Sequence, residues 1–333
     1  MFTDQATRLG PVAIDVVICT YNRADGLDAV LSALSRQRPA ADVTWSVLVV
    51  DNASTDSTAA VVDSYRSRHL LPGLRRVPEY EQGLTPARRR GVQETRAPWI
   101  AFIDDDNILE PGWLDAIADT IRLRPGAGAI GGRVVLDWER PPPATFKRFG
   151  FCFAEQDPGG VASELNNLVG AGMVVSREAL VECGWLERPL LADRVGKRLI
   201  SGGDVEIAQR IRGAGYSLWF TPEAVLLHRI PASRASWHYL LRVNYGLGGS
   251  EALVGALTWP GDWQSWRRTA QWRVIKTLGG ALVRPHGLVG TLASLSFAIG
   301  AARGVGACAV MTAEERQALL GAAVRKKKAL SRK

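Results

Sequence analysis

The feature that most constrains the fold is a regular alternation of strand-like and helix-like segments in the first third of the chain. Four apolar segments have the length of buried strands: residues 14–20, 45–50, 74–77 and 99–103. A segment with helical periodicity or helix-cap residues follows each of them: residues 25–34, 54–68, 85–96 and 111–123. Such alternation predicts an α/β fold with a mostly parallel central sheet and helices on both faces.

The alternation becomes less regular after residue 124. Further strands are predicted at these segments: residues 129–136, 171–176, 217–220 and 224–228. A helix follows Gly202-Gly203, and the chain is predicted to be helical from Ser236 onward. In the helix of residues 85–96, Thr85 is the expected N-cap and Pro86 lies in the first turn. These changes of pattern divide the chain into three regions: 1–124, 125–235 and 236–333.

The cysteines and the N-terminus indicate the compartment. The four cysteines lie far apart and form no CxxC pair, so the sequence predicts neither a zinc site nor a disulfide framework. The first 20 residues lack the basic stretch and long apolar core of a signal peptide. A reducing, cytoplasmic location is therefore expected.

Positive charge is concentrated in the last third. From Ser236 onward there are 14 Lys and Arg residues against 4 Asp and Glu residues, and five of the eleven tryptophans. A solvated helix face or a basic tail is the simpler interpretation. The mixture also suits a lipid headgroup layer, with residues 286–311 as an apolar segment and the terminal RKKKALSRK attracting anionic lipid. We expect peripheral association with the membrane, although residues 286–311 could equally form a packed core helix. No recognised nucleic-acid module is present, so nucleic acid is not an expected partner.

Polar residues follow three of the predicted strands, at 20–22, 51–52 and 104–106. Because the carboxyl ends of parallel strands meet at one edge of a sheet, these residues are expected at a common ligand crevice. Asp104, Asp105 and Asp106 repel one another there unless a cation is bound, and Mg²⁺ or Mn²⁺ prefers oxygen ligands. The alternative interpretation is a turn that leads into the next helix.

Other residues have a structural and a functional interpretation. Asp51 could end a solvated turn or accept a hydrogen bond from a nucleobase, with the Tyr21 ring stacked beside it. At most one or two of Arg88, Arg89 and Arg90 can face the crevice, and one of them could bind phosphates bidentately near the start of the helix. Asp204 could be a helix N-cap, or a general base at a glycine-rich junction that allows closure. His228, at the end of a strand, could be structural or a ligand of a metal or a phosphate.

These motifs together resemble those of family 2 glycosyltransferases, which have the GT-A fold. VVICTYNR resembles the first strand and loop of that family, and VLVVDNASTD resembles its second strand. GLTPARRRGV, IAFIDDDNILEPGW and GGDVEIAQRIRGAGY are similar to its arginine segment, its DxD segment and its acceptor-side ED motif. Gly203 replaces the glutamate of the ED pair. The resemblance covers roughly residues 12 to 230.

The resemblance implies a metal-dependent transfer of a sugar from a nucleoside-diphosphate sugar, with UDP favoured, to a glycan or lipid-linked hydroxyl, with inversion, in polysaccharide or cell-envelope glycan synthesis. Asp204 would be the catalytic base, and Asp106 with His228 would bind Mn²⁺ or Mg²⁺. The donor would contact the following residues: Thr20, Tyr21, Asn22, Asp51, Arg88, Asp104 and Asp105. Two rival functions remain at this point, a catalytically silent nucleotide-sugar-binding protein and a sugar-nucleotide nucleotidyltransferase. The lack of a glycine-rich phosphate loop disfavours the second.

Overall fold

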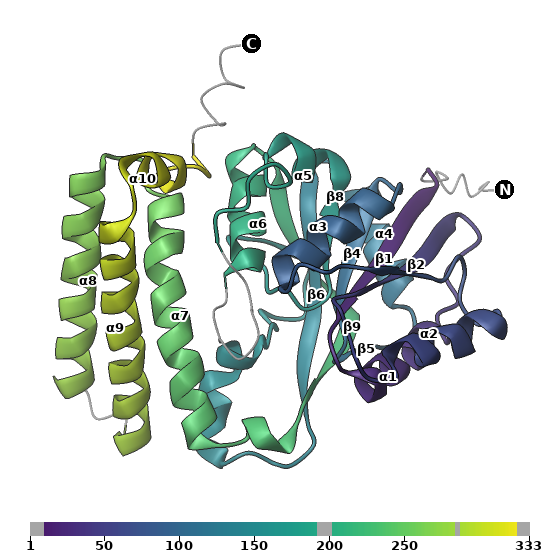
Figure 1. Cartoon of the computed structure of the whole chain (residues 1–333), viewed down its shortest axis with the longest axis horizontal. Helices are drawn as coiled ribbons and strands as arrows, with labels where there is room; N and C mark the ends of the chain where they lie inside the picture. The colour runs from purple at the N-terminus through teal and green to yellow at the C-terminus, as the bar shows by residue number, and fades with distance from the viewer. Residues whose placement is uncertain (1–9, 192–201, 284–286, 325–333) are drawn as a thin grey trace, which may run out of the picture.

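The computed structural model describes residues 10–191, 202–283 and 287–324 (Figure 1). Its strands are β1 (Val12–Thr20), β2 (Val43–Asp51), β3 (Arg75–Pro78), β4 (Trp99–Asp104), β5 (Asn107–Leu109), β6 (Ala127–Trp138), β7 (Ser163–Leu165), β8 (Met173–Ser176) and β9 (Ser217–Ile230). Its α-helices are α1 (Ala24–Leu34), α2 (Thr58–Ser67), α3 (Leu84–Glu94), α4 (Trp113–Leu123), α5 (Arg177–Glu182), α6 (Gly203–Gly213), α7 (Trp237–Leu257), α8 (Trp263–Val283), α9 (Gly287–Val310) and α10 (Ala313–Leu319). Two 3₁₀ segments, η1 (Ala144–Phe153) and η2 (Ala232–Arg234), complete the set.

One continuous sheet joins the first two predicted regions, in the strand order β3-β2-β1-β4-β8-β6-β9-β5, with β7 also paired to β9. The four strands predicted in the first region, β1 to β4, are parallel, as expected from their alternation with helices. The second half is mixed, because β8 runs antiparallel to both β4 and β6. The fold is therefore the expected α/β sheet with an additional helical region after residue 236.

The two predicted strands at 217–220 and 224–228 form one strand, β9. It pairs in parallel with β6 along its whole length, and a register shift lets residues 222–224 leave the ladder. Proline cannot donate to a ladder, so Pro222 is tolerated only at such an irregularity. The sequence analysis predicted two short strands here instead of one long strand. It also missed the short strands β5 and β7, which have three residues each.

The prediction that Thr85 caps its helix is wrong. Helix α3 begins at Leu84, and Gly83 is its N-cap with φ of 142°. That conformation is open to glycine and strained for other residues. The Gly83 N–H donates to Asn52 Oδ1 at 2.8 Å, which fixes the start of the helix beside the end of β2.

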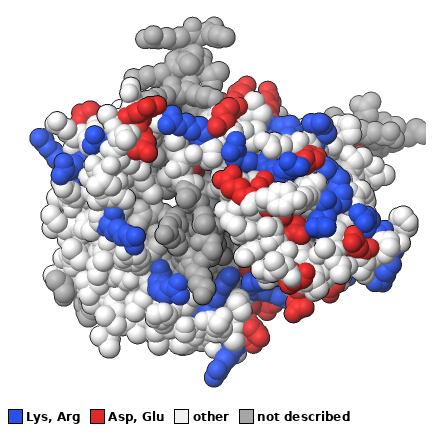
Figure 2. Space-filling view, viewed as in Figure 1, with Lys and Arg blue, Asp and Glu red and all other residues white. Residues whose placement is uncertain are grey.

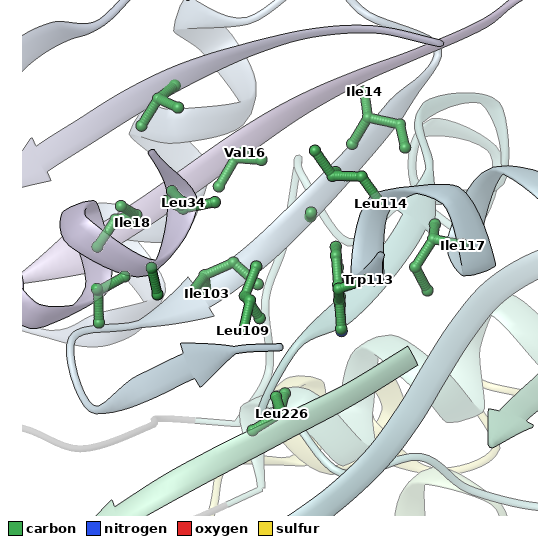
Figure 3. Packing of buried hydrophobic residues seen from close by; sticks show 14 of the residues in the cluster. Ile14, Val16, Ile18, Leu34, Ile103, Leu109, Trp113, Leu114, Ile117 and Leu226 are labelled. Atoms are coloured by element: carbon green, nitrogen blue, oxygen red, sulfur yellow. The ribbon is translucent and has the colours of Figure 1, made fainter. Parts of the chain in front are cut away.

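Both faces of the sheet are covered, and successive residues of β1 point to opposite sides. Val16 packs with α1 and α4 in a cluster centred on Trp113 and Leu114 (Figure 3). Val17 packs in a second cluster with residues of α3, α5 and α6 on the other face. A strand buried on both faces must be apolar at every position, which is why β1 and β4 stand out in the sequence.

The C-terminal helices form a separate layer beside the sheet, with α9 between α7 and α8 (Figure 1). Glycines let α7 and α9 approach closely, because a Cβ at Gly300 would fall inside contact distance of the Tyr245 carbonyl oxygen. Gly248 lies in the same way against the Phe297 carbonyl. Within the described residues, α9 is the single helix long and apolar enough to cross a membrane, and 39% of its most apolar window is buried. This composition is also found in core helices of soluble proteins.

The close contact between α7 and α9 generates a stability prediction. Gly300→Ala places a methyl group against backbone, which cannot move aside as a side chain can, so we expect it to lower the free energy of unfolding by about 1–3 kcal/mol. Gly306→Ala is the matched control, because nothing lies within 4 Å of its added Cβ. We expect the control to be neutral or to gain up to about 1 kcal/mol from helix propensity. Urea unfolding of both variants measures this; equal effects would contradict the proposed contact.

Candidate functional site

A cleft of about 710 Å³ opens at the carboxyl ends of β1 and β4. Its lining includes the acidic triplet Asp104–Asp106, the first helical turn of α6, and residues of α7 and α9. Strand ends, helix start and C-terminal helices therefore border one cavity. This is the edge at which the sequence predicts a ligand crevice.

The three adjacent aspartates point at three different partners. Asp104 ends β4, and its Oδ1 lies 3.7 Å from Arg88 Nη2. Asp105 accepts a hydrogen bond from the Thr20 hydroxyl at 2.8 Å. Asp106 is buried and faces cations. Because the strand has ended at Asp104, the chain turns between the three residues, and their carboxylates separate instead of stacking on one face.

Asp106 lies among three basic side chains. Its Oδ1 is 3.4 Å from His228 Nε2, and its Oδ2 is 3.6 Å from Arg234 Nη1 and 3.7 Å from Arg23 Nη2. Burial alone would raise the pKa of Asp106, but the contacts with His228, Arg234 and Arg23 outweigh it and hold the pKa below its ordinary value. Asp106 is therefore a carboxylate whose negative charge is retained although it is buried.

Asp105 behaves in the opposite way. Burial, together with the negative charge of Asp106, raises the pKa of Asp105 to about 7. Arg23 Nε lies 3.7 Å from Asp105 Oδ1 and opposes this rise only in part. A bound cation would lower the pKa of Asp105 again by the same Coulombic argument.

His228 is held in one orientation that suits a metal ligand. The antiparallel pairing of β5 and β9 places Asn107 opposite His228, next to Asp106. His228 Nδ1 lies 2.8 Å from the Phe153 carbonyl oxygen, which can only accept, so Nδ1 carries the proton and donates. In the neutral ring this leaves the Nε2 lone pair facing the Asp106 carboxylate. Two electron-pair donors need a cation between them: a proton on Nε2 makes His228 an imidazolium that donates to Asp106, and in its place the pair can hold Mn²⁺ or Mg²⁺.

The described residues include no cluster of three or more His, Cys, Asp and Glu side chains with metal-site geometry. Two protein ligands are enough for Mg²⁺-type ions, because these retain water and bind substrate phosphates as further ligands.

The predicted donor residues lie in two layers. Thr20, Tyr21 and Arg88 line the cleft directly, together with Asp104 and Asp105. Tyr21 is half exposed in this lining. Arg88 is buried, and its guanidinium lies 5.5 Å from the centre of the Phe102 ring.

Asn22 and Asp51 are not part of this lining. Asn22 accepts from the Thr55 N–H at 2.7 Å and so orders the loop after β2. Asp51 is buried and pairs with Arg76 at 2.8 Å, while accepting from the Ser54 N–H at 2.9 Å. A nucleobase N–H would have to share the Asp51 carboxylate with Arg76, a residue that the sequence analysis did not single out.

Asp204 lines the same cleft from another direction. Helix α6 begins at Gly203 with Gly202 as N-cap, so Asp204 is not the cap residue considered from the sequence. Its carboxylate accepts from the Gly170 N–H at 2.8 Å and the Val205 N–H at 2.9 Å. A Cβ at Gly170 would lie 2.8 Å from Asp204 Oδ2, so a side chain there would displace the carboxylate.

Two cleft arginines escaped the sequence analysis. Arg23 follows the predicted polar cluster 20–22 by one residue, so extending that cluster would have found it. Arg234 lies on η2, between the sheet and the C-terminal helices, and no local pattern marks it. It reaches Asp106 only because β9 returns the chain to this edge of the sheet.

Glu206, in the first turn of α6, has a structural role. It is fully buried, accepts from the N–H groups of Leu190 and Leu191, and lies 3.2 Å from Arg210. A buried carboxylate with these partners anchors the segment before α6 and so holds the helix start that presents Asp204.

Comparisons with known proteins agree with this arrangement. Glycosyltransferase AglE of Haloferax volcanii is 26% identical over 226 residues, which are 65% of this chain and 66% of that protein. The glucosyl-dolichyl phosphate glucuronosyltransferase of the same organism is 24% identical over 53% of this chain and 57% of that protein. The chain thus matches less than two thirds of the length of either relative.

A solved structure shares the fold. The mannosyltransferase PcManGT from Pyrobaculum calidifontis, in complex with GDP-Man and Mn²⁺, aligns with a TM-score of 0.56 over 94% of this chain and 86% of that chain, at 19% identity. The likeness supports the expected GT-A-type architecture.

The family model described as glycosyl transferase family 2 matches residues 15–184, about half of the chain, and this segment runs from within β1 to beyond β8 and contains the acidic triplet. The chain belongs to glycosyl transferase family 2.

Proposed function

We propose that the protein transfers a sugar from a nucleoside-diphosphate sugar, a UDP-sugar being favoured, to a hydroxyl of a glycan or lipid-linked acceptor, with inversion. The observation that carries this proposal is the single cleft that contains both the Asp106–His228 pair and the Asp204 carboxylate. The first is suited to a metal-diphosphate unit and the second to a proton acceptor. The three predicted regions would then bind the donor (1–124), bind the acceptor (125–235) and add a helical extension (236–333).

The donor diphosphate would lie over the acidic triplet. A divalent ion held by Asp106 and His228 would neutralise charge on the leaving diphosphate. Arg23 and Arg234, released from Asp106 as that ion binds, are positioned to pair with phosphate oxygens. The roles proposed for the nearby side chains are ribose or sugar contacts by Asp104 and Asp105, and phosphate contact by Arg88.

The base would be contacted at the neighbouring strand ends. The exposed ring of Tyr21 can stack on a flat base, and Thr20, Asn22 and Asp51 shape the loop beneath it. Asp204, oriented by the Gly170 and Val205 N–H groups, would take the proton of the acceptor hydroxyl as it attacks the anomeric carbon. Direct displacement by that hydroxyl, on the side opposite the leaving diphosphate, inverts the centre.

Removing the Asp106 carboxylate tests the metal site. Asp106→Asn keeps the shape but weakens a hard-cation ligand, so we expect binding of UDP or GDP to lose its dependence on Mn²⁺. Calorimetric titration of each nucleotide, with and without Mn²⁺, measures it. Asp63→Asn is the control, because Asp63 lies half exposed on α2, outside the cleft, and pairs with its helix neighbour Arg66. Equal Mn²⁺-dependent nucleotide binding by the wild type, Asp106→Asn and Asp63→Asn would refute Asp106 as a metal ligand.

Removing the charge of Asp204 tests the base. Asp204→Asn can still accept the Gly170 N–H through its one amide oxygen and loses only the contact with the Val205 N–H, so the fold and donor affinity should change little. Transfer should fall about 10²–10⁴-fold, the usual contribution of general-base catalysis. Single-turnover transfer and calorimetric donor binding are measured on the same preparation. Near-normal turnover would assign Asp204 to loop structure alone.

We further propose that the C-terminal region rests on the cytoplasmic face of a membrane. Exposed apolar side chains recur at helical spacing on α8 (Trp272, Ile275, Val283) and on α9 (Leu288, Leu292, Ile299, Val310). Each set lies along one stripe of its helix, because the spacings are close to multiples of 3.6. Figure 2 shows that the surface over these helices is mostly uncharged, with scattered Lys and Arg. The terminal RKKKALSRK, to which the sequence analysis assigned lipid attraction, lies outside the described residues.

Vesicle co-sedimentation tests this association with the full chain. Ile275→Glu with Leu292→Glu puts negative charge on both stripes, and we expect it to abolish sedimentation with anionic vesicles at low salt. Val161→Glu is the control, because Val161 is just as exposed but lies in the catalytic body. If the wild-type chain stays in the supernatant, or if all three proteins sediment alike, the stripes do not bind lipid.

A further inference from the structure

A second cavity lies between the C-terminal helices. It has a volume of about 340 Å³, within the usual range of small-molecule pockets. Ala301 and Val305 of α9 form part of its lining, α7 and α8 border it, and Trp259, Trp266 and Trp272 line it as well. A groove with this apolar and aromatic lining suits a hydrocarbon chain.

The groove adjoins the catalytic cleft. Glu251 of α7 and Phe297 of α9 line both cavities. The junction is also close to the proposed base, because a Cβ at Gly202 would touch Ser250, the residue before Glu251, at 3.5 Å. A molecule whose hydroxyl reaches Asp204 can therefore extend past Ser250 and Glu251 into the groove.

One wall of the groove carries positive charge. Arg273 and Lys276 of α8 line it, and the Lys276 ammonium lies 5.0 Å from the centre of the Trp272 ring. The positive charge of Arg273 acts on Glu251 at the junction, where it opposes the rise in the pKa of Glu251 that burial causes. Two cations against one carboxylate leave net positive charge where the groove meets the cleft, which suits a phosphate group.

We propose that this groove binds the chain of a lipid-linked acceptor, an isoprenoid or alkyl phosphate, with the phosphate against Arg273 and Lys276 and the hydrocarbon over α9. The inference rests on the proposed function, because it assigns the acceptor class of the same active site. It also connects two observations that otherwise stand apart, the cleft and the exposed apolar stripes. A lipid drawn from the membrane beside α8 and α9 would enter the groove without crossing water.

Farnesyl diphosphate below its micelle concentration is a suitable probe, with pyrophosphate and farnesol as the head and the chain alone. We expect the full-length protein to bind farnesyl diphosphate roughly tenfold or more tightly than either part, since both surfaces contribute. Saturating UDP with Mn²⁺ should leave this binding intact. Calorimetry and tryptophan fluorescence both report it, and neither needs sugar transfer.

Two variants locate the ligand. Arg273→Ser with Lys276→Ser should weaken farnesyl diphosphate binding roughly tenfold or more, the loss expected when charge-assisted contacts are removed. Thr269→Trp, which adds bulk to the groove wall, should weaken farnesyl diphosphate and farnesol alike. Arg268→Ser is the matched control, because Arg268 is exposed on the same helix and lines neither cavity.

The outcomes separate the two proposals. Displacement of farnesyl diphosphate by UDP with Mn²⁺ would place it in the donor site and overturn the groove assignment. Equal loss in Arg268→Ser would show diffuse charge attraction and overturn it as well. Retained binding of farnesyl diphosphate in a protein that binds no nucleotide would support the groove while refuting the proposed transfer reaction.

Discussion

Strands β1 and β4 run side by side in parallel, with Cys19 paired to Asp104. That register places Thr20 next to the start of the acidic triplet, and its hydroxyl bonds Asp105. The positions of the other cleft residues depend on this edge of the sheet. If β4 continued for two more residues, its side chains would alternate between the two faces of the sheet, and Asp104 and Asp106 would share one face. Ending the strand at Asp104 lets each carboxylate meet a different cation or hydroxyl.

Burial then divides the triplet into groups with different chemistry. Asp106 is surrounded by His228, Arg234 and Arg23 and retains its charge, whereas Asp105 has less compensating positive charge and its pKa rises to about 7. In both, the deciding quantity is the positive charge within a few ångströms, since desolvation acts on both alike. The mixed half of the sheet supplies that charge, because β9 delivers His228 and leads into η2 with Arg234.

The C-terminal helices belong to the site as much as to the periphery. Helix α7 lines the cleft and the second groove, and α9 contributes Phe297 to both. Their close packing is possible because glycines meet backbone carbonyls, at Gly248 and at Gly300. These glycines lower the helix propensity of α7 and α9. They also let the two helices pack at a distance that larger residues would prevent.

Local sequence determined the elements that carry a local signal. The apolar runs of β1, β2 and β4 predict buried strands, because both faces of each are covered, and the polar residues that follow them predict the ligand edge. Motif resemblance then assigned roles to Asp204 and His228, which local reading had left with two interpretations each. Tertiary structure decided the rest. Strand β8 runs antiparallel between β4 and β6, and the Phe153 carbonyl orients His228. Arg76 forms an ion pair with Asp51, and Arg234 forms one with Asp106. These contacts join residues far apart in sequence, so their formation depends on the register of whole strands and leaves no periodicity or spacing in the chain from which it could be inferred.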